Sequence, residues 1–212
     1  MKKATLTLVV LILATSFATS QSLTKGFKGG LNIATLGGAD ADNADLKSIT
    51  TFSAGVFFNL SLPGPISIQP EVLYSQKGAK SSVPGLTVTY NLVYVEVPVL
   101  LKFNIPLAPG SPVKPNIFAG PAVGFLLTAK VKADPPSPPA LPAETDIKDQ
   151  TTNTDFGVVF GAGLDIDLVA LQLTIDARYN LGLTTIDKNG NSSGTKADIK
   201  NRVMSVNVGI AL

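Results

Sequence analysis

Residues 90–104 read YNLVYVEVPVLLKFN, and this stretch decides the fold. Its odd-numbered face is wholly apolar and consists of Val93, Val95, Val97, Val99, Leu101 and Phe103. The other face mixes apolar bulk with one acid and one base: Leu92, Tyr94, Glu96, Pro98, Leu100, Lys102 and Asn104. A period of two predicts a β-strand. The stretch exceeds the roughly nine to eleven residues that a tilted bilayer-spanning strand needs. The pattern alone leaves open whether the apolar face points into a protein core or into lipid.

The composition points to a chain that spreads its hydrophobicity over many short segments. Only 15% of the 212 residues are charged, and the mean hydropathy is +0.31. Soluble domains carry about 25% charged residues. After residue 20, no apolar run approaches the roughly 20 residues of a transmembrane helix. The absence of Cys and His excludes disulfides, thiolate metal sites and the commonest general base.

Residues 1–20 are predicted to be a secretory signal. Lys2 and Lys3 precede an apolar run from Leu6 to about Phe17, and small residues at Ala18 and Ser20 favour cleavage before Gln21. The alternative is a retained membrane anchor. Without Lys2 and Lys3, the 17 basic residues fall to 15, which balances the 15 acidic ones. Binding of nucleic acid by a basic face therefore has little support.

The rest of the chain, residues 21–212, predicts eight strands in one domain. Their ranges are 25–36, 51–62, 66–77, 90–104, 116–132, 155–167, 171–185 and 199–212. The connections alternate between long and short, as in outer-membrane barrels with long extracellular loops and short periplasmic turns. The second faces carry Gly, Ser, Asn and isolated charges, which suit the crowded interior of a small barrel. We therefore expect an all-β fold, an eight-stranded antiparallel up-and-down transmembrane β-barrel, whose apolar faces meet lipid.

Three prolines lie inside the predicted strands, at Pro70, Pro98 and Pro121. Proline cannot donate a hydrogen bond to the ladder, and a closed barrel has no edge to accommodate it. We expect bulges, missing ladder bonds or different strand limits there.

Several segments together resemble a known family. They are GFKGGLNIATL (26–36), IQPEVLYSQKG (68–78), LVYVEVPVLLKF (92–103), IFAGPAVGFLL (117–127) and DARYNLGL (176–183). They are similar to the outer-membrane β-barrel domain of PorT-like, or porin-like, proteins of Bacteroidetes, over most of residues 25–212. The resemblance implies an eight-stranded barrel in the outer membrane. It implies no single activity and supplies no catalytic residues; PorT itself is associated with protein secretion.

Six charged side chains fall on the inward faces of the predicted strands: Glu71, Glu96, Lys102, Asp165, Asp176 and Arg178. Buried charge must be paired, so we expect a lumen charge network that plugs the barrel. Glu96 and Lys102 are six residues apart on one strand and should find partners on neighbouring strands, with Lys102 towards the periplasmic end. The alternatives are a narrow ion path or solute pocket, or acid–base work by Glu71 and Glu96 if they lie close together.

Other candidate sites have simpler explanations. Asp40, Asp42 and Asp45 lack the Gly and the terminal Glu of a calcium loop, so a solvated loop is expected. The Pro-rich stretch 134–142 predicts a stiff surface loop. No catalytic residue, metal site or cofactor is predicted.

The function expected from these features is non-enzymatic. The chain is expected to be a monomer in the cell outer membrane, after signal cleavage near Ser20, with outer-membrane lipid as its surroundings. Other envelope proteins are possible partners through the loops or turns, and nucleic acid is not. The role would be structural, adhesive or within an envelope complex. Two alternatives stay open: a narrow channel for small solutes or ions, and a secreted soluble barrel that binds a ligand.

Overall fold

The computed structural model describes residues 23–42, 46–83, 86–108, 110–134, 143–189 and 196–212. The predicted signal sequence, Asp45 and residues 135–142 of the Pro-rich loop lie outside this part of the chain. Among the described residues, no helix is both long enough and apolar enough to span a bilayer.

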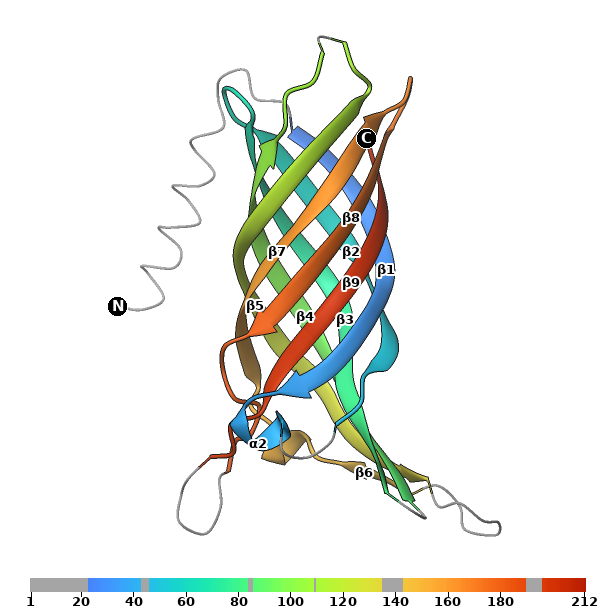
Figure 1. Cartoon of the computed structure of the whole chain (residues 1–212), viewed down its shortest axis with the longest axis vertical. Helices are drawn as coiled ribbons and strands as arrows, with labels where there is room; N and C mark the ends of the chain where they lie inside the picture. Colours follow the sequence, from blue (N-terminus) through green and yellow to red (C-terminus); the bar gives the residue numbers. More distant parts are fainter. Residues whose placement is uncertain (1–22, 43–45, 84–85, 109, 135–142, 190–195) are drawn as a thin grey trace.

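Eight antiparallel strands close into a ring, as Figure 1 shows. The ring contains β1 (Leu23–Gly37), β2 (Ile49–Ser61), β3 (Ile66–Val83), β4 (Leu86–Asn104), β5 (Val113–Asp134), β7 (Thr154–Asp167), β8 (Gln172–Gly182) and β9 (Lys200–Ala211). Each strand pairs with its neighbours along the chain, and β1 pairs with β9 to close the ring. The predicted all-β, up-and-down barrel is therefore confirmed.

The two ends of the barrel differ. The backbone N–H of Leu212 donates to the Lys25 carbonyl, so both ends of the described chain lie at one rim, which we call the termini end. The connections 62–65, 105–112 and 168–171 are also at this end. At the opposite rim, the loop end, β1, β3, β5 and β8 end and β2, β4, β7 and β9 begin.

The structure corrects several predicted loops at the loop end. Residues 78–88 were expected to be a polar loop, but β3 and β4 continue through them as a hairpin that projects past the ring. The long loop before β7 contains a short strand, β6 (Ala143–Asp146), which pairs with β5, and a 3₁₀ turn, η1 (Lys148–Gln150). A four-residue helix, α2 (Ala39–Asp42), stands where no helix was expected. Alternation of apolar residues does not report polar strands outside the membrane, because both their faces meet water.

The prolines leave the register unchanged. The β3–β4 ladder passes from Pro70 opposite Val99 directly to Leu73 opposite Glu96, so two intervening pairs are missing on the same register. The β4–β5 ladder likewise skips two pairs beyond Pro98. Pro121 sits in a β5–β7 ladder without a gap. Each of the three prolines thus lies at a missing pair in one ladder: Pro70 opposite Phe58, Pro98 opposite Glu71 and Pro121 opposite Val99. The register shift in the β4–β5 ladder falls at Val93/Tyr94, away from all three.

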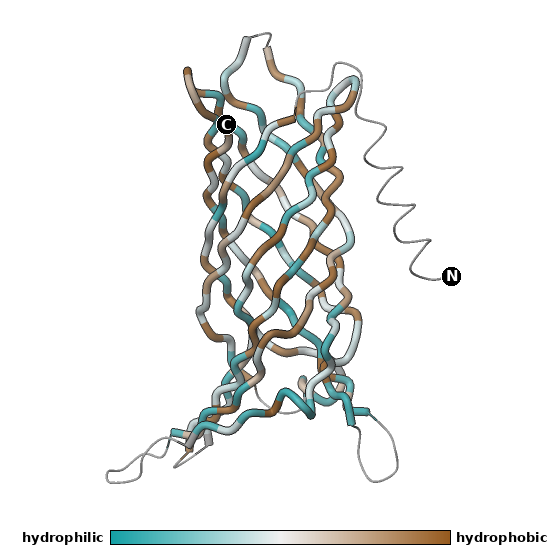
Figure 2. The backbone as a smooth tube through the Cα atoms, turned by 180° about the vertical axis from the view of Figure 1, so that it is seen from behind, coloured by the Kyte–Doolittle hydropathy of each residue, from teal (hydrophilic) through white to brown (hydrophobic). Residues whose placement is uncertain are grey.

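The apolar faces of the strands point outward. Along β4, Val99, Leu101 and Phe103 are exposed, whereas Leu100 and Lys102 are buried. The other strands repeat this pattern, and in Figure 2 hydrophobic and hydrophilic stretches alternate along the wall, with the hydrophilic colour denser at the loop end. Arg202 on β9 lies ten residues from Leu212, which is level with Lys25. At about 3.3 Å per residue and a tilt of about 40°, that stretch spans about 25 Å, the height of the apolar band of outer-membrane barrels.

Candidate functional site

The inward faces of the strands meet in a lumen that holds nine buried charged side chains. They are Lys28, Glu71, Lys77, Glu96, Lys102, Asp155, Asp165, Asp176 and Arg178, each no more than 7% exposed. All six residues predicted for the lumen are among them. They form three groups along the barrel axis.

The central group contains two cations and two carboxylates. Lys28 Nζ lies 2.9 Å from both Glu71 Oε1 and Asp176 Oδ2. Arg178 donates from Nη1 to Glu71 Oε2 at 2.7 Å and from Nε to Asp176 Oδ1 at 2.7 Å. Asn207 Nδ2 donates to Asp176 Oδ1 at 2.9 Å. The group is neutral, and each carboxylate contacts both cations, which is what burial of charge requires.

The second group lies nearer the termini end and is joined to the first by one amide. Lys102 Nζ lies 2.8 Å from Asp165 Oδ2. Lys102 also donates to Gln69 Oε1 at 3.1 Å. The other end of the same amide, Gln69 Nε2, donates to Glu71 Oε1 at 2.6 Å. Gln69 therefore links two ion-paired groups that share no charged residue.

The third group lies nearer the loop end and has one more acid than base. Lys77 Nζ lies 3.4 Å from both Glu96 Oε1 and Asp155 Oδ2. Asn180 Nδ2 donates to Glu96, and Asn201 Nδ2 donates to Asp155 Oδ2 at 2.9 Å. The amide groups thus donate hydrogen bonds to the two carboxylates, and these bonds partly replace the contacts that a second cation would make. The nine buried charges comprise four bases and five acids, so the described lumen carries a formal charge of −1.

The pairings in the structure match the expectation for Glu96 and differ from it for Lys102. Glu96 pairs with Lys77 on the neighbouring strand β3. Lys102 lies towards the termini end, but its ion-pair partner Asp165 is on β7, one strand beyond the neighbouring β5. Glu71 and Glu96 bind different cations in different groups. A facing pair of carboxylates for acid–base work is therefore absent at these two positions.

Sequence reasoning missed three members of the network: Lys28, Lys77 and Asp155. The sequence did indicate two of them. Lys77 is an even number of residues from Glu71 on the same predicted strand, and Asp155 is an even number from Asp165, so each pair points to the same face. Lys28 lies in a Gly-rich segment whose weak alternation hides which face is inward.

Aromatic rings fill the space beside three of the four buried cations. Three cations lie over ring faces: Lys28 over Phe57 at 5.0 Å, Lys77 over Tyr94 at 5.2 Å and Arg178 over Phe118 at 5.2 Å. Such contacts are favourable, more so in a desolvated site. Each ring lies against a glycine of a neighbouring strand: a Cβ on Gly26 would lie 2.7 Å from Phe57, on Gly124 3.2 Å from Tyr94, and on Gly161 2.8 Å from Phe118. These glycines make room for bulky rings in a narrow lumen.

The packing leaves little free volume at mid-height. A void there of about 20 Å³ is lined by residues that include Ser75, Glu96, Arg178 and Ser205. That volume holds about one water molecule. At the termini end a wider polar vestibule of about 350 Å³ opens, lined partly by Lys114, Asp165 and Asp167.

The loop end is covered by an apolar cap. Leu36, Leu92 and Tyr94 of the wall pack with residues from α2 and the connections, namely Ala41, Leu46, Ile147, Ile186 and Ile199. Asp198 holds α2 in place by accepting from the Ala39 N–H at 3.1 Å. The hydrogen bond from Lys200, together with the Ala39 N–H, keeps the pKa of the Asp198 carboxyl below its ordinary value. Among the described residues, no cluster of three or more acids suits a metal ion.

Comparison with known proteins agrees with this architecture. A family model described as "Outer membrane protein beta-barrel domain" matches residues 19–188. Among solved structures, neisserial surface protein A (NspA) is similar at a TM-score of 0.50 and 12% identity, covering 91% of this chain and 99% of that chain. OprG of Pseudomonas aeruginosa has a TM-score of 0.46 and 11% sequence identity, covering 91% of this chain and 97% of that chain. Ail of Yersinia pestis has a TM-score of 0.44 and 12% sequence identity, covering 89% of this chain and 98% of that chain. These identities show likeness of fold alone. No curated protein matches the chain.

Proposed function

This chain belongs to the outer membrane protein beta-barrel domain family, and we propose that within it the chain is a non-enzymatic structural or surface protein with a closed lumen. One observation carries the proposal. Ion-paired and hydrogen-bonded side chains bridge the lumen from wall to wall, and the mid-height void is about 20 Å³. A hydrated ion has no room there unless the network opens.

We propose that the termini end faces the periplasm and the loop end faces the cell exterior. The supporting feature is the distribution of the connections, since outer-membrane barrels keep short turns inside and long loops outside. The ring has no open strand edge within the membrane, and this favours a monomer.

The proposal of a non-enzymatic role follows from the chemistry of the lumen. The chain has no His and no Cys, and each buried lumen carboxylate is ion-paired with a lysine or arginine. A secreted soluble barrel for an apolar ligand would need apolar groups inside and polar groups outside, the reverse of this wall.

A role in an envelope complex, including secretion, is the finer proposal. Its support is the resemblance to PorT-like proteins, and the loop-end hairpin offers a projecting surface. Capture of partners from detergent extracts tests it, because a secretion role requires stable partners, and a chain recovered alone under crosslinking would contradict it.

The rival function is a narrow cation channel. The feature that favours it is the formal charge of −1 in the lumen, together with the vestibule that leads to Asp165. A residual pathway lined by excess carboxylate would select cations.

Planar-bilayer recording separates the two functions. We expect the purified protein to give no reproducible single-channel steps, because the three ion-paired groups close the lumen. The Glu96→Gln variant should likewise give no single-channel steps. Reproducible steps in the wild type whose size changes with Glu96→Gln would contradict the closed lumen and establish the channel.

A further inference from the structure

The termini end carries an apolar rim. The turn at 168–171 reads LVAL, and Leu168, Val169 and Ala170 are exposed, with Val169 wholly so. The connection at 105–108 reads IPLA and is also exposed. We call residues 105–108 and 168–171 the rim turns. Turns that meet water are usually built from Gly, Pro, Asn, Asp and Ser. Of these residues the two segments contain only Pro106, although Gly110 and Ser111 follow the first segment in the same connection.

The rim turns continue the lipid-facing rows of their strands. On β4 the exposed row Leu101 and Phe103 runs on without a break into Ile105 and Leu107, although the strand ends at Asn104. On β7 the outward row that includes Leu164 continues to Leu168, beyond the end of the strand at Asp167. The apolar surface therefore does not end where the ladder ends.

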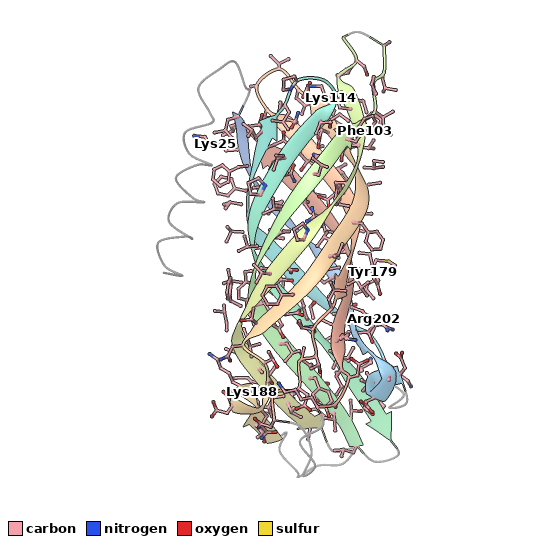
Figure 3. All side chains as sticks on the ribbon, turned by 90° about the vertical axis from the view of Figure 1, so that its left-hand side faces the viewer. Lys25, Phe103, Lys114, Tyr179, Lys188 and Arg202 are labelled. Atoms are coloured by element: carbon pink, nitrogen blue, oxygen red, sulfur yellow. The ribbon has the colours of Figure 1, made fainter. Side chains whose placement is uncertain are left out.

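The charges at the two rims are arranged as follows. Lys114 and Asp167, which pair with each other, line the vestibule rather than the outer wall, whereas Lys25 lies in the outward row of β1. At the loop end, two outward rows end in charge, at Arg202 on β9 and Lys130 on β5. Figure 3 shows Lys25, Phe103 and Lys114 near one end, with Arg202 and Lys188 towards the other.

We propose that the rim turns lie in the interfacial layer of the membrane and contact lipid rather than water. The wall between Arg202 and the level of Lys25 already spans about 25 Å, which matches the hydrocarbon band. Apolar residues beyond it therefore reach the layer of the lipid headgroups and the ends of the acyl chains. Their continuity with the lipid-facing rows favours lipid over a protein partner as the occupant. This inference rests on the proposed place of the barrel in the outer membrane.

The chain contains no Trp, so single-tryptophan variants report depth without background. The rim variants are Leu107→Trp and Val169→Trp, the reference within the band is Val99→Trp, and the aqueous reference at the opposite end is Lys188→Trp. Each protein is folded into phosphatidylcholine vesicles, with and without bromine near the carbonyl end of the acyl chains. Bromine quenches tryptophan only at close range.

Both rim variants should lose emission in brominated vesicles and emit at shorter wavelength than Lys188→Trp, as Val99→Trp does. The inference is overturned if the rim variants are as unquenched as Lys188→Trp while Val99→Trp is quenched, because the rim would then lie in water and be available to a soluble partner. If Val99→Trp is also unquenched, the barrel is not in the bilayer, and both the inference and the proposed function fall.

Discussion

Replacing Arg178 by methionine is expected to lower the free energy of unfolding by about 3–5 kcal/mol, the cost of removing one partner from a buried ion pair. Arg178 contacts both Glu71 and Asp176. Without it, Lys28 alone would serve two buried carboxylates. Denaturant titration of the protein folded in lipid vesicles measures the effect.

Two controls separate lost pairing from lost bulk. Lys130→Met removes an exposed pair with Glu144 and should leave the stability almost unchanged. Adding Glu71→Gln to Arg178→Met leaves Lys28 with Asp176 as a balanced pair, so part of the lost stability should return. An Arg178→Met variant as stable as Lys130→Met would show that the central group does not form.

Replacing Val97 by arginine should cost about 2–4 kcal/mol, as for a charge on the lipid face near the bilayer midplane. Val97 lies in the middle of the outward row of β4, between Val93 and Phe103. The arginine would have to leave water for hydrocarbon, where no partner is available. Denaturant titration in vesicles measures the cost, and the yield of folded protein measures insertion.

The matched control is Thr87→Arg, on the same strand and of the same parity but in the hairpin beyond the membrane, opposite Asp134. It should change stability by no more than about 0.5 kcal/mol, as surface substitutions usually do. Equal effects of Val97→Arg and Thr87→Arg would show that the outward face of β4 is not in lipid.

Much of the barrel could be predicted from the sequence because a membrane strand must satisfy two environments at once. Lipid outside and a crowded lumen inside impose period two, and this period placed Val97 outside and Glu71 inside correctly. The constraint ends where the membrane ends. Beyond Ala79, the described residues of the hairpin are partly or fully exposed on both faces, so its polar sequence was read as a loop.

The charge network was predictable as a set but not in its pairings. The alternation of side chains along each strand showed which of them face inward. Which of them pair depends on the diameter of the barrel and on the offset between its strands, and neither can be read from the sequence. Lys102 on β4 accordingly pairs with Asp165 on β7, one strand beyond its neighbour β5. The glycines opposite Phe57 and Phe118 are a similar case, since each glycine is explained only by the ring that it faces.

One face of the wall meets lipid and the other closes the lumen, and thiols introduced at two buried serines test this closure. Ser75 and Ser205 line the mid-height void and are no more than 7% exposed. The chain has no Cys, so Ser75→Cys and Ser205→Cys each introduce a single, nearly isosteric thiol. Ser61→Cys and Ser82→Cys, at the exposed positions of the two ends, are the accessible controls.

The measurement is the rate at which a small charged thiosulfonate modifies each thiol in the folded protein, followed by mass spectrometry. We expect rapid modification of both controls and none at Ser75→Cys or Ser205→Cys until the protein is unfolded. Modification of the two lumen thiols in the folded protein at the rate of the controls would show that the lumen is filled with water and not closed.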